Sequence, residues 1–276
     1  MFNKRHIVRT IAATVSILAL SFTAACGSGQ STASNSTDSD DITQQTYKPG
    51  KLTIATGQPA YEPWVMNDKP ESGEGYEAAV AYAVADKLGF KKSDVVWTRT
   101  AFDTAIAPGA KDWDFNIQQF GITDERKKAV DFSSSYYNDS QSVVVKKDSK
   151  FANATKVSDL KDATVGVMVG TLAYDYAKAN IKDDIQTFND DAALAQALDA
   201  GQIDALVTST VECVYMVQSE QVKDAKVLGR LPDSEDKSGM GIVLPKDSKL
   251  TAAVTKAVDD LNADGTIKKL QDKWLA

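Results

Sequence analysis

The chain has 276 residues and a formal net charge of −7 at pH 7, with 43% hydrophobic and 25% charged residues. This length and composition suit a folded protein with one large core or two lobes of ordinary domain size. The acidic balance argues against a nucleic-acid partner, because a surface that binds phosphates normally carries an excess of lysine and arginine.

Histidine and cysteine are scarce. The single histidine, His6, lies in a segment that we expect to be removed, so the mature protein would contain none. Ser-His-Asp catalysis, Cys-His catalysis and the usual zinc sites with histidine ligands are therefore excluded, whereas chemistry that uses carboxylates alone is not. The sequence indicates no catalytic residue, no metal site and no other cofactor. Cys26 and Cys213 lie in very different settings, so a structural disulfide is not expected.

The first 26 residues have the layout of a signal peptide. They begin with basic residues, continue with an apolar run at 11–22, and end in small residues before Cys26. This layout predicts export. An uncleaved membrane anchor is the alternative, but the apolar run is short for a span of about 20 residues.

The stretch "TAAC" followed by "GSG" resembles a bacterial lipoprotein box, although Thr23 stands where leucine is most common. In such a box the cysteine, here Cys26, becomes the lipidated first residue. Residues 27–50 are mostly small and polar, which predicts a flexible linker. The resemblance implies a protein anchored by lipid to the outer face of the bacterial cytoplasmic membrane.

Past the linker, short runs rich in β-branched and aromatic residues alternate with longer amphipathic runs. This alternation predicts βαβ units and an α/β fold with mainly parallel sheets. A first set has strands expected at 51–56, 94–100 and 113–120, with helices at 75–89 and 102–107. The same order returns in a second set, with strands at 164–169, 184–188 and 204–210 and helices at 171–180 and 191–201. The repeat favours two similar lobes.

The chain is expected to cross between the lobes twice, which makes a hinge. Residues 142–150 and 239–250 are both β-rich runs that end in Lys-Asp-Ser-Lys turns. The last helices have apolar residues spaced at three and four, as expected for packing back on the first lobe. We therefore predict lobe 1 at 51–144 and 241–276, and lobe 2 at 145–240.

From residue 51 onwards the chain resembles the extracellular solute-binding proteins of the polar amino-acid type, family 3. The resemblance is carried by "GYEAAVAYAVADKLG", "ITDERKKAVDFSSSYY", "VGVMVGT" and "ALDAGQIDAL". It implies a type II periplasmic-binding-protein-like fold of two lobes that close by hinge motion over a small carboxylate ligand, most simply an amino acid. It also implies a monomer that presents this ligand to the permease of an ABC transporter.

The resemblance assigns the ligand's α-carboxylate to Arg126, the arginine of the Thr-x-x-Arg motif. A guanidinium suits this role, because its planar fork of donors matches a carboxylate. A surface ion pair with Asp124, Glu125 or Asp131 is the alternative. The turn at Thr171 and Leu172 would offer amides at a helix N-terminus to the same carboxylate, or simply a helix cap.

Aromatic side chains are expected to form the walls of the cleft. Tyr61, Trp64 and Phe102 match family positions at which rings line the pocket, and flat apolar walls are usual in sites for small ligands. The alternative for each ring is burial in the core.

The resemblance fails where the family holds the ligand's α-ammonium. Ser209 stands in place of an aspartate, and Gln119 and Gly121 stand where the family often has hydroxyl residues. Glu212, three residues past Ser209, would either reach the cleft or merely complement a helix N-terminus. The ligand is therefore either an amino acid held differently or one whose amine is modified or absent.

Two other functions compete with solute binding. An enzyme on the same scaffold, such as a carboxylate-dependent dehydratase or a glycan lyase, would need an acid or base, and Glu212 and Glu77 are the candidates. A ligand-sensing lobe pair would need a signalling module, and none is recognisable in the sequence.

Overall fold

The computed structural model describes residues 41–275, and Asp40–Ala276 form one compact unit of the chain. The predicted signal peptide, Cys26 and the predicted linker up to residue 40 lie outside this range. Across residues 41–275, no helix combines the length and the apolar content needed to cross a membrane.

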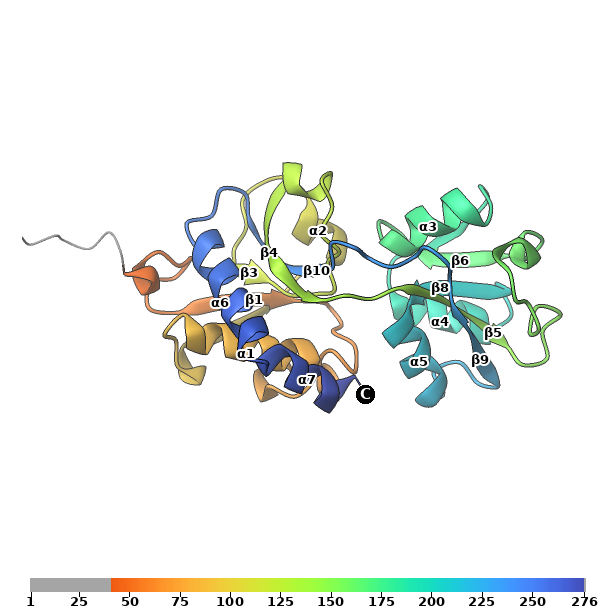
Figure 1. Ribbon diagram of the computed structural model, residues 1–276, viewed down its shortest axis with the longest axis horizontal. Helices are drawn as coiled ribbons and strands as arrows, with labels where there is room; N and C mark the ends of the chain where they lie inside the picture. Colours follow the sequence, from red (N-terminus) through yellow and green to blue (C-terminus); the bar gives the residue numbers. More distant parts are fainter. Residues whose placement is uncertain (1–40, 276) are drawn as a thin grey trace, which may run out of the picture. The chain divides into compact units, whose positions relative to one another are not determined.

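The first of two five-stranded sheets in this range has the strand order β2-β1-β3-β10-β4 (Figure 1). β1 pairs in parallel with β2 and β3, whereas β10 pairs antiparallel with β3 and β4. The strands are β1 Leu52–Thr56, β2 Val95–Arg99, β3 Phe115–Asn116, β4 Val130–Tyr137 and β10 Met240–Pro245. Every residue of β1 is buried, as its apolar run predicts for a strand covered on both faces.

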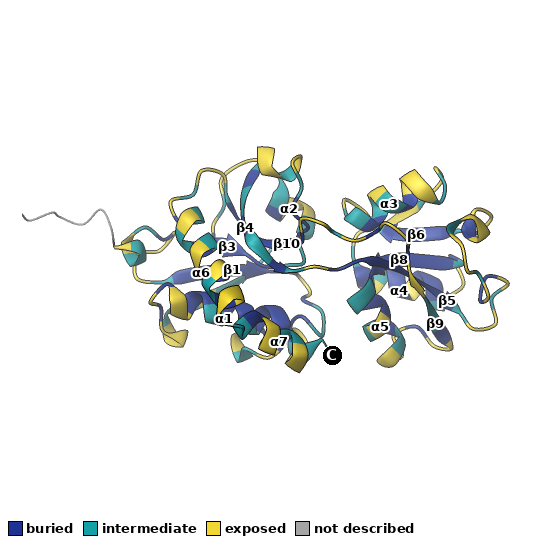
Figure 2. Cartoon of the chain, viewed as in Figure 1, coloured by how far each residue is buried: buried dark blue, intermediate teal, exposed yellow. Residues whose placement is uncertain are grey.

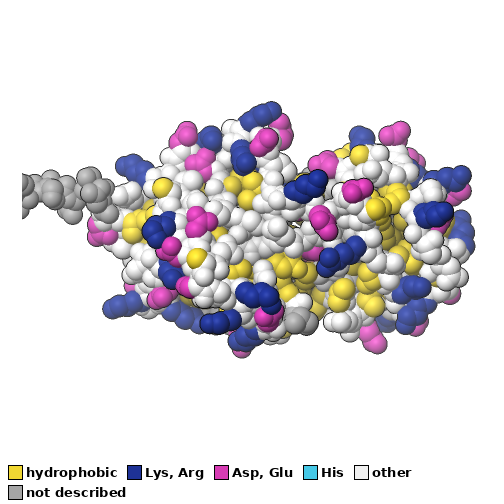
Figure 3. All heavy atoms as spheres, viewed as in Figure 1, with side chains coloured by type: hydrophobic (Ala, Val, Ile, Leu, Met, Phe, Trp, Pro, Cys, Tyr) yellow, Lys and Arg dark blue, Asp and Glu magenta, His cyan; other side chains and the backbone are white. Residues whose placement is uncertain are grey.

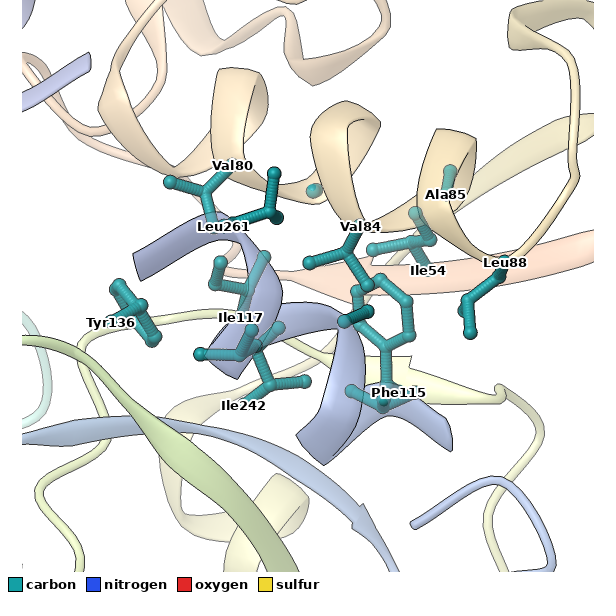
Figure 4. Packing of buried hydrophobic residues seen from close by; sticks show 14 of the residues in the cluster. Ile54, Val80, Val84, Ala85, Leu88, Phe115, Ile117, Tyr136, Ile242 and Leu261 are labelled. Carbon is teal, nitrogen blue, oxygen red and sulfur yellow. The ribbon is translucent and has the colours of Figure 1, made fainter. Parts of the chain in front are cut away.

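Helices cover this sheet and close the core of lobe 1. They are α1 Tyr76–Lys87, α2 Phe102–Ile106, α6 Thr251–Ala263 and α7 Thr266–Trp274. Figure 4 shows Val84 of α1 and Leu261 of α6 with Ile54, Phe115 and Ile242 of the sheet, all buried. Burial of each such side chain stabilises the fold by about 1.5–3 kcal/mol.

The second sheet has the order β7-β6-β8-β5-β9 and forms lobe 2 with three helices. The elements are β5 Gln141–Lys146, β6 Val165–Met168, α3 Leu172–Asn180, β7 Gln186–Phe188, α4 Asp191–Asp199, β8 Ala205–Ser209, α5 Thr210–Gln218 and β9 Ala225–Arg230. Val143 and Val145 of β5 pack in the cluster that includes α3, and Val144 packs on the opposite side with α4 and α5. Figure 2 shows the buried strands beneath helices with exposed outer faces.

The chain crosses between the sheets earlier than the sequence indicates. β4 ends at Tyr137 and β5 begins at Gln141, so the first crossing is residues 138–140, and the second lies between β9 and β10 at 231–239. The two crossings lie side by side, because Asp236 N donates to Asp139 O at 2.9 Å. The runs at 142–150 and 239–250 were expected to be the crossings. They instead contain β5 and β10, whose apolar residues are buried within sheets.

Regular structure is also present before residue 51. Within the predicted linker, residues 42–44 form a 3₁₀ helix whose Ile42 packs against the core of lobe 1. Tyr47 N donates to Asp114 Oδ1 at 2.5 Å, and Thr53 N donates to Asp114 Oδ2 at 2.6 Å. The buried Asp114 carboxylate needs such donors, and this requirement ties residues 41–50 to lobe 1.

The surface mixes both signs of charge. On the face shown in Figure 3, acidic and basic side chains are interspersed over both lobes.

Candidate functional site

The two lobes line a cleft, in which about 800 Å³ of space, part of it open to solvent, is not filled by atoms of the chain. Its walls come from the loop after β1, from α2, from the loop after β3, from both crossings and from the starts of α3, α4 and α5. In α/β folds, strand ends and helix N-termini often meet in this way around ligands. The cleft is lined by nine of the residues expected in the site: Tyr61, Phe102, Gln119, Gly121, Arg126, Thr171, Leu172, Ser209 and Glu212.

Trp64 is the expected wall residue that the structure places elsewhere. Its side chain is fully buried in the core of lobe 1, with ring centroids 5.9 Å from Tyr76 and 5.6 Å from Tyr137. Tyr61, three residues earlier, turns to the cleft instead. Both rings are large and apolar, and their spacing does not show which one faces the core.

Arg126 joins the two lobes at the cleft. Its guanidinium donates to Gly121 O of lobe 1 at 2.7 Å and to Gly170 O of lobe 2 at 2.8 Å. It also lies over the ring of Phe102, 5.5 Å from the centroid, in a cation–π contact. Burial lowers the pKa of Arg126, but an arginine remains charged at neutral pH. A fixed cation therefore stands between the lobes.

The surface ion pair considered for Arg126 is not formed. Asp124 pairs with Lys127, Glu125 with Lys128 and Asp131 with Lys246. The neighbouring lysines satisfy these acids, which leaves the arginine to the cleft.

Thr171 serves as the cap of α3. Its hydroxyl accepts from Tyr174 N at 3.2 Å and donates to Met168 O at 2.8 Å. The same turn lines the cleft, with Leu172 and Ala173 beside it. The N-terminus of α3 is therefore both capped and directed at the cleft, where its dipole favours negative charge.

Ser209 and Glu212 share the start of α5. Ser209 Oγ caps the helix by accepting from Glu212 N at 3.2 Å, and the Glu212 side chain turns into the cleft. Thr208 Oγ1 donates to Glu212 Oε2 at 2.8 Å. Burial raises the pKa of Glu212 well above its usual range, and the nearby charge of Asp191 adds to this effect. The sequence leaves open whether Glu212 reaches the cleft or lies at a helix N-terminus. In the structure Glu212 does both, because its side chain lines the cleft and its residue lies in the first turn of α5.

Gln119 is held in place from behind by Glu77. Its backbone is in the left-handed region, with φ 50°. The Glu77 carboxylate accepts from Gln119 N at 2.8 Å, from the Gln119 side-chain amide and from the Tyr136 hydroxyl. Glu77 is fully buried and does not line the cleft, so the structure does not place it as an acid or base that contacts a ligand.

Sequence reasoning missed several polar residues of the cleft. They are Gln118, Asp139, Asp191, Thr208 and Asp236. Asp139 and Asp236 lie on the two crossings, so misplacing the crossings hid them. For Asp191 a signal existed, because Asp190 alone caps α4 by accepting from Ala193 N at 2.8 Å. Because Asp190 already caps the helix, the adjacent Asp191 is not needed as a cap, and its carboxyl group can face the cleft.

The fold and the cleft define a two-lobed α/β binding protein. The chain belongs to the bacterial extracellular solute-binding proteins, family 3, whose sequence profile matches residues 52–276.

Two relatives whose ligands are named are binding proteins. The L-arginine-binding protein of Pseudomonas aeruginosa is 29% identical over 245 residues, which cover 83% of this chain and 88% of the relative. The L-cystine-binding protein TcyJ of Escherichia coli is 30% identical over 217 residues, covering 78% and 79%. The solved structure of an ancestral arginine-binding protein bound to arginine has a TM-score of 0.69 and 31% identity, covering 82% of this chain and 99% of that one.

Proposed function

We propose that this protein captures an amino acid for an ABC importer and that Arg126 binds the α-carboxylate of this ligand. The observation that carries the proposal is the position of the Arg126 guanidinium, which is half-buried in the cleft, lies over the ring of Phe102 and is hydrogen-bonded to both lobes. Arginine and cystine, the ligands named for the relatives, are both amino acids. A carboxylate between the lobes would receive donors from Arg126 and from the start of α3.

Ligand capture would work by closure of the lobes. Arg126 contacts one carbonyl on each lobe, and a ligand that binds the same guanidinium would lie between the two surfaces. The crossings at 138–140 and 231–239 supply the hinge. Closure excludes water and strengthens the charge-assisted hydrogen bonds inside the cleft.

The direct test is substitution of Arg126. Arg126→Ala should abolish binding, since truncating one partner of a buried charge pair costs about 2–5 kcal/mol. Arg126→Lys should restore the charge without the fork and should recover only part of the affinity. Lys127→Ala is the matched control, because Lys127 is adjacent and pairs with the exposed Asp124. Calorimetric titration against the twenty standard amino acids measures all four proteins, and wild-type affinity in Arg126→Ala would remove Arg126 from the site.

The protein is proposed to bind its ligand without converting it. The relatives bind solutes, although one similar solved structure, at 30% identity and a TM-score of 0.69, is an ancestral amino acid-binding protein described as a precursor of cyclohexadienyl dehydratase. Mass spectrometry of the ligand that co-purifies, before and after prolonged incubation with fresh protein, distinguishes the two activities. An unchanged mass and fragmentation pattern supports binding, and a new product would show turnover.

Attachment to the membrane is proposed to use Cys26, with the partner permease in the same membrane. The support is the lipoprotein-box resemblance and the family's extracellular location. Cys26→Ser should release the protein from the membrane fraction or leave it unprocessed. A Cys26→Ser protein that still carries lipid would contradict the proposal.

A further inference from the structure

The cleft carries more negative than positive side chains. Four carboxyl groups line it, those of Asp139, Asp191, Glu212 and Asp236, against the single guanidinium of Arg126. Within residues 41–275, none of these acids takes part in an ion pair with lysine or arginine. Arg126 interacts electrostatically with Asp236 and Asp175, so it does not compensate the other three cleft acids.

Asp191 and Glu212 form a close pair around one hydroxyl. Each residue is 7% exposed. Thr208 Oγ1 lies 2.8 Å from Glu212 Oε2 and 3.5 Å from Asp191 Oδ1, and its single hydrogen serves only one of them. Asp191 is therefore a buried carboxyl group that faces the cleft without a strong donor among the described residues. Leaving such a group ionised and unpaired is costly.

Among residues 41–275, no cation compensates the charge of the pair. Five neighbouring groups interact with one or both carboxyl groups, and none of the five is a cation. They are Asp190 at the cap of α4, Asp139 of the first crossing, Glu77 of α1, Tyr61 of the loop after β1 and Cys213 of α5. Among the four cleft acids, Arg230 lowers the pKa of Asp139 alone. Burial raises the pKa of both Asp191 and Glu212. The charge of Asp190 adds to this effect at Asp191, and the charge of Asp191 adds to it at Glu212, which favours a shared proton on the pair.

Other acceptors in the same cleft also lack partners. Gln118 Oε1 and Asp236 Oδ2 are buried and accept no hydrogen bond from any described residue. Both residues line the cleft. Acceptors without donors indicate a ligand rich in N–H groups. A metal ion is not indicated, since no group of His, Cys, Asp and Glu in the described part of the chain is arranged to hold one.

The geometry points to a cation subsite formed by Asp191, Thr208 and Glu212, which binds a protonated amine or guanidinium of the ligand and releases a proton as it does so. This inference rests on the proposed function, because it concerns the amine end of the same cleft. The pair holds one proton between two carboxyl groups in the free protein. When the ligand's cation enters, this proton leaves to solvent and both carboxylates accept N–H bonds from the ligand. The pair thus replaces the aspartate missing at Ser209.

The experiment is calorimetric titration at pH 5, 6, 7 and 8, each in two buffers of different ionisation enthalpy. The difference between buffers gives the number of protons released. We expect release of up to about one proton per ligand near pH 6, and affinity that rises on the order of tenfold from pH 5 to pH 7. The probes are L-lysine, L-arginine, L-norleucine, L-citrulline and 6-aminohexanoate.

These probes separate the two sources of the cation. Proton release with L-norleucine and L-citrulline, and none with 6-aminohexanoate, assigns the pair to the α-ammonium. Release with L-lysine, L-arginine and 6-aminohexanoate alone assigns it to a cationic side chain.

Substitutions test the pair directly. Asp191→Asn and Glu212→Gln should each weaken binding on the order of tenfold or more and reduce proton release. Asp190→Asn is the matched control, since it neutralises the adjacent acid outside the cleft lining while keeping a good helix cap. Asp190→Asn should bind with nearly wild-type affinity.

The wild-type titration remains decisive if either cleft variant fails to fold. The inference is overturned if ligand binds without proton release at every pH, or if neutralising Asp191 or Glu212 strengthens binding. Equal losses of affinity in Asp190→Asn and Asp191→Asn would also overturn the inference. The effect would then come from the total negative charge of the region and not from direct contact of Asp191 with the ligand. Failure of the proposed function is distinguishable, since no amino acid would then bind or Arg126→Ala would bind normally.

Discussion

Gly121 and Leu172 approach each other across the cleft so closely that a side chain at residue 121 would force the Leu172 side chain to shift. A Cβ atom at Gly121 would lie 2.5 Å from Leu172 Cδ1 and 2.9 Å from Asp236 Oδ2. Gly121 belongs to lobe 1, and Leu172 begins α3 of lobe 2. Glycine at position 121, where the family often has a hydroxyl residue, therefore leaves room for the side chain of Leu172. The two residues lie in contact distance across the cleft when the lobes are together.

Gly121→Ala should weaken ligand binding because Leu172 must move before the lobes can reach this arrangement. Overpacking of this kind costs about 1–3 kcal/mol, which corresponds to roughly five- to 150-fold in affinity. The double variant Gly121→Ala/Leu172→Ala should recover most of the loss. Calorimetry of the four proteins gives the coupling energy, and additive effects would show that the two residues do not meet in the ligand-bound protein.

Glu77→Gln should destabilise lobe 1 and loosen Gln119. The carboxylate accepts three hydrogen bonds in the core, and an amide cannot accept all of them. We expect a loss of about 1–3 kcal/mol in the free energy of unfolding at pH 7.5, together with weaker ligand binding. Urea denaturation and calorimetry measure the two effects. An unchanged free energy of unfolding would contradict the role assigned to Glu77.

The free energy of unfolding should also depend on pH through the titration of Glu77. Burial raises the pKa of Glu77 from 4.5 to about 7 in the folded protein. Between these values the folded state binds more protons than the unfolded state, so the free energy of unfolding falls as pH rises through this window. Wild type should lose about 2 kcal/mol more than Glu77→Gln between pH 5 and pH 7.5. Parallel urea profiles for the two proteins would exclude this titration.

Substitutions at Trp64 should change stability and leave binding alone. Trp64→Ala should lower the free energy of unfolding by about 3–5 kcal/mol, as expected for a large cavity. Trp64→Phe should cost less than about 1.5 kcal/mol, because the buried indole Nε1 has no hydrogen-bond partner among the described residues to lose. Thermal unfolding and calorimetry separate the two readouts. A stable Trp64→Phe protein with tenfold weaker binding would show that Trp64 contributes to the ligand site.

Tyr215→Phe should speed ligand release. The Tyr215 hydroxyl of lobe 2 donates to Glu62 Oε2 of lobe 1 at 2.5 Å, outside the contacts made by Arg126. A hydrogen bond to a charged group is worth about 1.5–3 kcal/mol when sheltered and less when partly exposed, so a three- to tenfold rise in the dissociation rate is expected. Tyr82→Phe is the control, since that hydroxyl donates to Glu71 O within lobe 1. Stopped-flow fluorescence compares the rates, and equal rates in Tyr215→Phe and wild type would show that this contact does not hold the lobes together.

The sequence alone determined the α/β class, the repeated lobe and the position of Arg126. Strand and helix patterns are local, because burial of one face or both imposes a period on neighbouring residues. The run at β1 and the capped turn at Thr171 therefore appear in the structure where the sequence predicts them. Arg126 was predictable because a short motif fixes its distance from the end of a strand.

Only the tertiary structure decided which residues meet in the cleft. Trp64 and Tyr61 are both aromatic, and the packing of Tyr76 and Tyr137 around Trp64 determined which one is core. Asp139, Asp191 and Asp236 come from two crossings and a helix start, and no local pattern links them. Their convergence depends on where the chain leaves each sheet, which is fixed by strand pairing between residues far apart in the sequence. The sequence therefore shows that Ser209 stands in place of an aspartate. Only the fold shows which carboxyl groups line the cleft around Ser209.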